Sequence, residues 1–473
     1  MSREVRTSRL VTLAAALAVT AGVGAGYVVT RNHSSSHAAA APSTSPSTSP
    51  MTVPSSPPPR GPVLAGLAAT APVPAAAGVA ADLQGAAQTV AGSAELVGEV
   101  VDADTGVRLW SRGASQPTAP ASTTKLLTAA AALTALGPDF RIATTTRRAG
   151  HTVYLVGGGD PTVVQSPRSS YSPRYPRPAS LADLARRTIA ALGGVHRVRL
   201  RLDTSAWSGP TMAVGWKPNY VTEGDVTPPS PLELDEGRVN PHDEFAARTE
   251  TPAAQAGAAF ATLLAKGGVQ VIGPVTAGTA APGSVPLASV SSPPLAELVQ
   301  RMLTESDDDL AEALGRAVAI HDQLAPTFLG AATAVERQVR ALGIPVQGVS
   351  LQDASGLSHR DRITPAVLVG VLRAAVAPSD RALRPILEGL PIAGLTGTLA
   401  TRYRDLPAAK AAGVLRAKTG TLTGVNALAG LVVDRSGRLL IFAFLASHAP
   451  DPGLTVPALD RMAARLARCG CAG

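Results

Sequence analysis

Residues 120–136 read PASTTKLLTAAAALTAL, a stretch in which a serine and a lysine precede a long run of alanine and leucine. That run has no helix breaker before Gly137 and predicts a helix over 126–136. Residues three apart share one face of a helix, which places Lys125 within reach of Ser122. A serine becomes a nucleophile when a base takes its proton, and a buried lysine with a lowered pKa is such a base. The alternative is an N-cap serine followed by a surface lysine.

A second motif, Lys418-Thr419-Gly420, lies within the strand-like run VLRAKTGTL at residues 414–422. Side chains alternate along a strand, so Lys418 and Gly420 are expected on one face and Thr419 on the other. A glycine in a strand often marks the close approach of another backbone or a ligand. Lys418 would offer a positive charge to a substrate carboxylate. The backbone N–H of Thr421 would donate a hydrogen bond to an oxyanion, as a second donor beside the N–H at the helix start near Ser122. The alternative is an edge strand with a solubilising lysine.

A third motif, Ser306-Asp307-Asp308, precedes a helix predicted over 310–320. Ser306 is expected to be the N-cap of this helix, and aspartates 307–309 suit its first turn, where negative charge is favoured. Helix capping alone would explain this motif. A catalytic role for it is therefore indicated only in combination with the first two motifs.

The rest of the chain predicts an antiparallel sheet that is flanked by helices and interrupted by an inserted module. Strands are predicted at 95–102, 107–111, 413–422, 427–433 and 439–446, with turns at 104–106 and 434–437. Helices are predicted at 75–91, 294–303, 310–320, 326–342, 364–377 and 456–467. Residues 141–289 are rich in glycine and proline and predict an α+β or mostly β module, with helices at 181–191 and 253–266. The core would then comprise residues 63–140 and 290–473.

The N-terminal segments predict a protein that works outside the cytoplasm. Residues 10–30 carry no charge, follow a basic flank and are long enough to span a bilayer. Residues 1–31 are therefore expected to be a membrane anchor or a signal segment that is cleaved on secretion. Residues 32–62 are mostly Ser, Thr, Pro and Ala and predict an extended linker.

The overall composition limits the partners and the chemistry. Of the 473 residues, 45% are hydrophobic, which excludes disorder of the whole chain. The net charge of +8 suggests an anionic partner such as nucleic acid, anionic lipid or an acidic wall polymer. No nucleic-acid partner is expected, because the basic residues are scattered and form no arginine-aromatic platform. Cys469 and Cys471 exclude a disulfide scaffold and a cysteine zinc site and are expected to be exposed thiols. No metal or cofactor is expected.

The three motifs, in this order, resemble those of penicillin-binding proteins and β-lactamases. More closely, the sequence resembles the D-alanyl-D-alanine carboxypeptidase/endopeptidase family, the class C low-molecular-mass penicillin-binding proteins. The wide gap between Ser122 and Ser306 fits that family's habit of inserting domains between the first two motifs. Flanking strings also resemble the family: LVGGGDPT at 155–162, SDDDLAEAL at 306–314, DASGLS at 353–358, AGLTGTL at 393–399 and AKTGTLTG at 417–424.

The resemblance implies a serine acyltransferase core of the penicillin-binding-protein/β-lactamase type, of class α+β or α/β, with an inserted α+β module. It implies a D-Ala-D-Ala carboxypeptidase, with possible D,D-endopeptidase activity, that acts on peptidoglycan stem peptides and is acylated by β-lactams. Ser122 resembles the nucleophile, Lys125 its general base and Ser306 a proton relay to the leaving amine. The substrate-binding positions would be Asp308, Lys418, Thr419, Gly420 and Thr421, and the backbone N–H groups of Ser122 and Thr421 would form the oxyanion hole.

The sequence departs from the family at Asp308, where the family's second motif has asparagine. Asparagine donates and accepts hydrogen bonds, whereas an ionised aspartate only accepts them. A carboxylate here would pair with Lys125 and hold it protonated, so slower acylation is expected. Three alternatives stay open: Asp308 is itself protonated or the site has adapted, the protein is a wall-binding pseudoenzyme, or it is a β-lactamase with fast deacylation.

Overall fold

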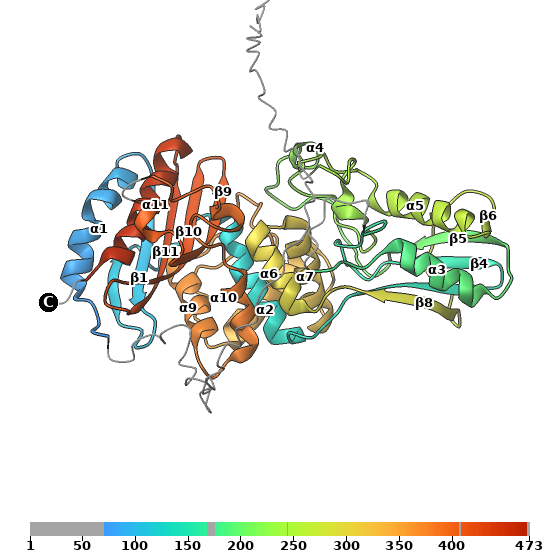
Figure 1. The fold of residues 1–473 in the computed structure, drawn as a ribbon, viewed down its shortest axis with the longest axis horizontal. Helices are drawn as coiled ribbons and strands as arrows, with labels where there is room; N and C mark the ends of the chain where they lie inside the picture. Colours follow the sequence, from blue (N-terminus) through green and yellow to red (C-terminus); the bar gives the residue numbers. More distant parts are fainter. Residues whose placement is uncertain (1–70, 168–175, 244, 406–407, 471–473) are drawn as a thin grey trace, which may run out of the picture. The chain divides into compact units, whose positions relative to one another are not determined.

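The computed structural model describes residues 71–167, 176–243, 245–405 and 408–470 (Figure 1). The predicted anchor or signal segment at 1–31 and the linker at 32–62 lie outside these residues. Among the helices of the described part, none combines the length and the apolar composition of a membrane span.

A five-stranded antiparallel sheet, in the order β2-β1-β11-β10-β9, organises one part of the fold. Its central strand, β11, is buried on both faces, which explains its uninterrupted apolar run, LLIFAFLAS. β1 pairs with β11 from Glu95 opposite Ser447 onward, so the two ends of the described chain meet in one sheet. The strands are β1 (Glu95–Asp102), β2 (Arg108–Arg112), β9 (Leu415–Leu422), β10 (Val425–Val433) and β11 (Leu439–Ser447).

Helices cover both faces of this sheet (Figure 1). Alternation along β11 sends Phe442 and Phe444 to the face covered by the first and last helices, and Ile441 and Leu445 to the other. On the first face lie α1 (Ala76–Ala91) and α11 (Pro452–Arg468). On the second lie α2 (Lys125–Leu136), α6 (Leu295–Glu305), α7 (Asp308–His321), α8 (Phe328–Ala341), α9 (Pro365–Val376) and α10 (Arg384–Gly389).

Residues 143–291 build a second, mixed sheet in the order β6-β5-β4-β3-β8, with β7 also paired to β5. Helices α3 and α5 contribute to its separate apolar core, which includes Leu155, Leu200 and Phe260. The elements are β3 (Ala143–Ala149), β4 (Thr152–Val156), α3 (Leu181–Leu192), β5 (Arg197–Asp203), α5 (Pro252–Lys266), β6 (Gln270–Val271), β7 (Thr276–Ala277) and β8 (Val285–Ser291). Among the described residues of 204–251, the helices are the short α4 (Tyr220–Glu223) and the 3-10 turn η2 (Asp235–Gly237).

The predicted strands of the core and the long helices all form, with ends shifted by a few residues. The 3-10 turn η1 (Ala121–Thr124) forms at the predicted start of the helix that carries Lys125. The short helices α4 and α10 and the 3-10 turns η3 (Arg381–Leu383), η4 (Gly397–Leu399) and η5 (Ala408–Ala411) have no counterpart among the predicted elements. Two expectations are wrong. Asp307, not Ser306, is the N-cap of α7, because Ser306 takes a left-handed conformation that ends α6. Cys469 is buried and disulfide-bonded, so it is not an exposed thiol.

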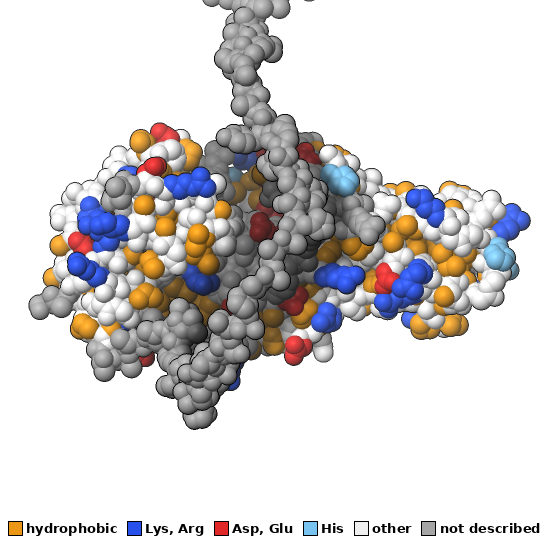
Figure 2. Space-filling view, viewed as in Figure 1, with side chains coloured by type: hydrophobic (Ala, Val, Ile, Leu, Met, Phe, Trp, Pro, Cys, Tyr) orange, Lys and Arg blue, Asp and Glu red, His pale blue; other side chains and the backbone are white. Residues whose placement is uncertain are grey.

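Basic side chains are spread over the face of the molecule drawn in Figure 2. On the face drawn in Figure 2, Lys and Arg lie over both the five-stranded part and the mixed-sheet part, interspersed with polar and apolar groups. On that face the positive charge is thus distributed, as the spacing of basic residues along the sequence predicts.

Candidate active site

Ser122 lies in the 3-10 turn η1. This turn runs directly into α2, whose first residue is Lys125. The φ of Ala121 is 48°, outside the helical region, so the chain turns sharply as it enters this helix. In a 3-10 turn, side chains three apart lie almost above one another. Lys125 Nζ accordingly lies 3.0 Å from the partly exposed Ser122 Oγ, and the two side chains paired from the sequence are in contact.

Lys125 is fully buried and has three oxygen partners. Besides Ser122, its Nζ donates to Asp308 Oδ1 at 2.6 Å and to the carbonyl oxygen of Ser355 at 2.8 Å. The segment that carries Ser355 is itself held, because Glu312 Oε1 accepts from the N–H groups of Ala354 and Ser355 at 2.9 Å each. The amine is therefore fixed in position by partners from three separate parts of the chain.

Asp308 is the first residue of α7, and its side chain is 15% exposed. Burial raises the pKa of Asp308 to about 6, against the opposing effect of the Lys125 charge. The carboxyl that replaces the asparagine of the second motif thus contacts the general-base candidate directly.

Ser306 and Lys418 form the second contact of the site. Lys418 Nζ donates to Ser306 Oγ at 2.9 Å and to its neighbouring carbonyl, that of Thr419, at 3.0 Å. Burial, reinforced by the charge of Lys125, lowers the pKa of Lys418 well below its ordinary value. The left-handed turn at Ser306, with φ of 62°, presents this hydroxyl between two helices.

The remaining predicted residues follow one another along β9. Thr419 Oγ1 donates to Thr398 Oγ1 at 2.8 Å, and Thr421 is exposed. A Cβ on Gly420 would lie 2.7 Å from the Pro120 carbonyl oxygen, so only glycine lets β9 approach the turn before Ser122 this closely. The structure thus brings the three motifs together.

Two groups in this site were not assigned from the motifs alone. Thr398 supports Thr419, and the Ser355 carbonyl supports Lys125. Both lie in strings that the family resemblance singled out, AGLTGTL and DASGLS. The residues after β5 also reach this region, since Trp216 Nε1 donates to Asp353 Oδ2 at 2.6 Å and Lys217 Nζ bonds the Thr423 hydroxyl.

A candidate metal-binding grouping lies next to the second motif. Carboxylate oxygens of Glu236, Asp307 and Asp309 lie within 4.8 Å of one another. Ion pairs from three arginines, Arg238, Arg248 and Arg301, already neutralise these carboxylates. This donor set is therefore an internal charge network and does not fit a cation.

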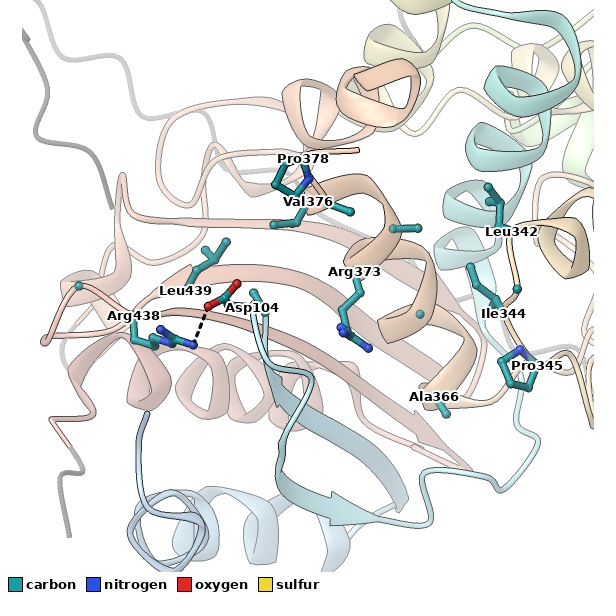
Figure 3. Close-up of a pocket in the computed structure, with 16 residues that line it drawn as sticks. Asp104, Leu342, Ile344, Pro345, Ala366, Arg373, Val376, Pro378, Arg438 and Leu439 are labelled. Carbon is teal, nitrogen blue, oxygen red and sulfur yellow. Dashed lines mark hydrogen bonds and ion pairs between the residues drawn. The ribbon is translucent and has the colours of Figure 1, made fainter. Parts of the chain in front are cut away.

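A cavity of 640 Å³ lies away from the three motifs, between α9 and the turns of the five-stranded sheet (Figure 3). Apolar side chains such as Ile344, Val376 and Leu439 line it, together with Arg373. None of the motif residues borders this cavity, so its size does not mark the candidate catalytic centre.

Comparison with known proteins gives consistent matches. A model of the D-Ala-D-Ala carboxypeptidase 3 (S13) family matches residues 79–247 and 240–468. The chain is 43% identical over 380 residues to carboxypeptidase DacB of Mycolicibacterium smegmatis, covering 80% of this chain and 81% of that protein. It is 29% identical over 460 residues to a D-alanyl-D-alanine carboxypeptidase of Actinomadura sp., covering 78% and 80%.

Solved structures agree on the fold. Penicillin binding protein 4 (dacB) of Haemophilus influenzae has a TM-score of 0.68 at 22% identity, over 82% of this chain and 99% of that chain. A second structure of that protein, complexed with a β-lactam, has a TM-score of 0.64 at 21% identity, over 81% of this chain and 98% of that one. The predicted fold class is thereby confirmed.

Proposed function

Because the chain belongs to the D-Ala-D-Ala carboxypeptidase 3 (S13) family, we propose that it removes the terminal D-Ala of peptidoglycan stem peptides through an acyl-enzyme on Ser122. The observation that carries this proposal is the 3.0 Å contact between Lys125 Nζ and Ser122 Oγ at a helix start. A buried amine within hydrogen-bond reach of a partly exposed hydroxyl is the arrangement of an activated serine nucleophile.

In the acylation step, Ser122 Oγ attacks the carbonyl carbon of the penultimate D-Ala while its proton passes to unprotonated Lys125. The carbonyl oxygen becomes an oxyanion, which the N–H groups of Ser122 and Thr421 would stabilise. The close packing of Gly420 on the turn before Ser122 supports this pairing of donors. Lys418 and Thr419 would bind the terminal carboxylate through charge and a hydroxyl hydrogen bond.

The carbon–nitrogen bond then breaks, and the leaving D-Ala amine needs a proton. Ser306 would relay to it the proton that Lys125 took from Ser122, since its hydroxyl bonds Lys418 Nζ at 2.9 Å and it lies two residues before the Lys125 partner Asp308. Water next attacks the acyl-Ser122 ester, the Ser122 oxygen regains a proton, and the shortened peptide leaves. A β-lactam would follow the first step and remain attached to Ser122.

A second candidate function, an attenuated or binding-only form of the same enzyme, is favoured by one observation. Asp308 Oδ1 lies 2.6 Å from Lys125 Nζ. An ionised carboxyl at this distance stabilises the protonated amine, which cannot accept the serine proton. Asp308 would thus lower the acylation rate and leave the substrate-binding groups in place.

The proposed location is outside the cytoplasm, with residues 10–30 as a membrane anchor or a cleaved signal. The support for this comes from the sequence alone: a charge-free run after a basic flank, followed by a Ser/Thr/Pro-rich linker. Cleavage of cross-links, a D,D-endopeptidase activity, is proposed on the family resemblance.

The experiment that tests the function is release of D-Ala from an N-acylated L-Lys-D-Ala-D-Ala peptide. We expect full-length protein to release D-Ala and to leave the same peptide with a terminal L-Ala intact. Ser122→Ala should release none. Equal release by the wild type and Ser122→Ala, or none by correctly folded wild type, would refute the proposal.

A further inference from the structure

The second motif has two faces. The side chains of Ser306 and Asp308 contact Lys418 and Lys125 in the candidate active site. The two aspartates that alternate with them, Asp307 and Asp309, contact a different set of groups, contributed largely by residues 227–248. One short segment thus joins the candidate catalytic groups to the residues inserted between the first two motifs.

Glu236 is the centre of that second set. Its carboxylate pairs with Arg238 at 2.7 Å, lies 3.7 Å from Arg248 and also pairs with Arg301, while its side chain is only 4% exposed. Its backbone is held too, because its carbonyl accepts from Thr227 Oγ1 and Arg248 Nη1 at 2.7 Å each. These contacts keep Glu236 at φ of 53°, a conformation that is uncommon for residues other than glycine.

Two of these arginines also pair with aspartates of the second motif. Arg301, on α6, pairs through Nε with Asp307 Oδ2 at 3.3 Å. Arg248 lies 3.9 Å from Asp309 Oδ2, and the N–H of Thr227 donates to Asp309 Oδ1 at 2.7 Å. In Figure 1, α6 and α7 lie where the inserted residues meet the helices of the core.

We infer that Glu236 is a positioning residue for the acylation reaction: through Arg301 and Arg248 it fixes Asp307 and Asp309, and thereby holds Ser306, the proposed proton donor to the leaving amine, at Lys418. This inference rests on the proposed function. Removing the Glu236 charge leaves Arg301 and Arg248 as buried charges with one partner fewer. Both arginines should then shift, and Asp307 and Asp309 should shift with them. Within the described residues, no hydrogen bond or ion pair joins Glu236 to Lys125, Lys418 or Ser122, so it would act through these partners.

The test compares benzylpenicillin acylation of full-length wild type with Glu236→Gln, which keeps the side-chain size and removes the charge. Three quantities are measured separately: the fraction of molecules that can be acylated, the dissociation constant of the non-covalent complex, and the acylation rate constant. We expect Glu236→Gln to lower the rate constant by about 10- to 100-fold, as a small misplacement of reacting groups does. The dissociation constant should change less than threefold, because Lys418 and Thr419 are held on β9.

A merely structural role gives another pattern. Loss of folded protein reduces the acylatable fraction and leaves the rate constant of the remaining molecules unchanged, and that outcome would overturn the inference. Asp183→Asn is the matched control, since Asp183 pairs with exposed Arg186 and Arg187 on α3, and it should leave all three quantities unchanged.

If Glu236→Gln does not fold, Asp307→Asn tests the same inference. Asparagine caps a helix as well as aspartate does, so this change preserves the start of α7 and removes only the charge that faces Arg301. It should lower the rate constant in the same way, and an unchanged rate constant would overturn the inference. An unreactive wild type would instead defeat the proposed function, and with it this inference.

Discussion

Lys125 Nζ lies closer to Asp308 Oδ1, at 2.6 Å, than to Ser122 Oγ, at 3.0 Å. The closest oxygen partner of the candidate base is therefore an acidic side chain and not the nucleophile. The pair is almost completely removed from water, with side chains 0% and 15% exposed, so the interaction is weakly screened. The reactivity of Ser122 should depend on which member of this pair carries the proton.

Asp308→Asn should speed acylation by benzylpenicillin. The amide keeps the shape of the side chain and removes the negative charge that favours protonated Lys125. Without that charge the Lys125 amine is freer to accept the Ser122 proton, so we expect acylation to be faster by about 10-fold. Stopped-flow acylation rates of the two proteins at one pH check this. A rate in the variant equal to or below the wild-type rate would contradict it.

Thr398→Val should weaken substrate binding more than it slows chemistry. Thr419 Oγ1 loses its 2.8 Å hydrogen bond to Thr398 and with it a fixed orientation toward the terminal carboxylate. A hydrogen bond of this kind is worth about 1 kcal/mol, so KM for an acyl-D-Ala-D-Ala peptide should rise about 3- to 10-fold with kcat nearly constant. Thr401→Val, at an exposed neighbouring threonine, is the control. A fall in kcat with KM unchanged would assign Thr398 a different role.

Gly420→Ala should impair acylation strongly. The added Cβ would lie 2.7 Å from the Pro120 carbonyl oxygen and 3.1 Å from Ala121 Cβ, so β9 and the turn before Ser122 must separate. Such a displacement of the two N–H donors should slow acylation on the order of 100-fold. Gly85→Ala, on α1 with no atom within 4 Å of the new Cβ, should leave acylation unchanged and stabilise the fold by about 0.5–1 kcal/mol. Normal acylation of Gly420→Ala would show that this close approach is not needed.

The stability contributed by two buried carboxyls should fall as pH rises from 5 to 8. Burial raises the pKa of Asp160 to about 6 and that of Asp309 to about 7, although hydrogen bonds from Thr162 and the charge of Arg248 oppose this. A carboxyl that holds its proton more tightly when folded contributes stability below its unfolded pKa, and this contribution is lost as pH rises through the folded value.

Asp160→Asn isolates one of these groups. Urea unfolding at pH 5 and pH 8 should show a free-energy difference that is smaller in the variant by roughly 1 kcal/mol. His359 and Lys418, whose pKa values are lowered by burial, act in the opposite direction in both proteins and cancel in the comparison. Identical pH dependence in the two proteins would rule out a buried, protonated Asp160.

Local patterns were sufficient for much of the fold. The apolar runs at 427–433 and 439–446 and the turn at 434–437 predict the hairpin β10–β11 because strand length and turn residues are encoded within a few positions. The breaker-free run after Lys125 likewise predicts α2. The mixed sheet is harder to predict, because two of its strands, β6 and β7, span two residues each and leave no periodic pattern.

The site is predicted less completely, and for a physical reason. Short motifs identify Ser122, Lys125 and Lys418, but not which distant groups the fold places against them. The Lys125–Asp308 pair joins residues 183 positions apart and was expected only from the family resemblance. The Arg301–Glu236 pair depends on a backbone conformation that no local pattern predicts. The N-cap prediction for Ser306 is wrong because serine and aspartate both suit that position, and tertiary contacts decide between them.

The most direct test of the central claim is the intact mass of full-length protein after incubation with benzylpenicillin, with Ser122→Ala in parallel. The account predicts one covalently bound penicillin per wild-type molecule and none on the variant. An adduct of equal yield on folded Ser122→Ala, or no adduct on folded wild type, would contradict the assignment of Ser122 as the acylated nucleophile.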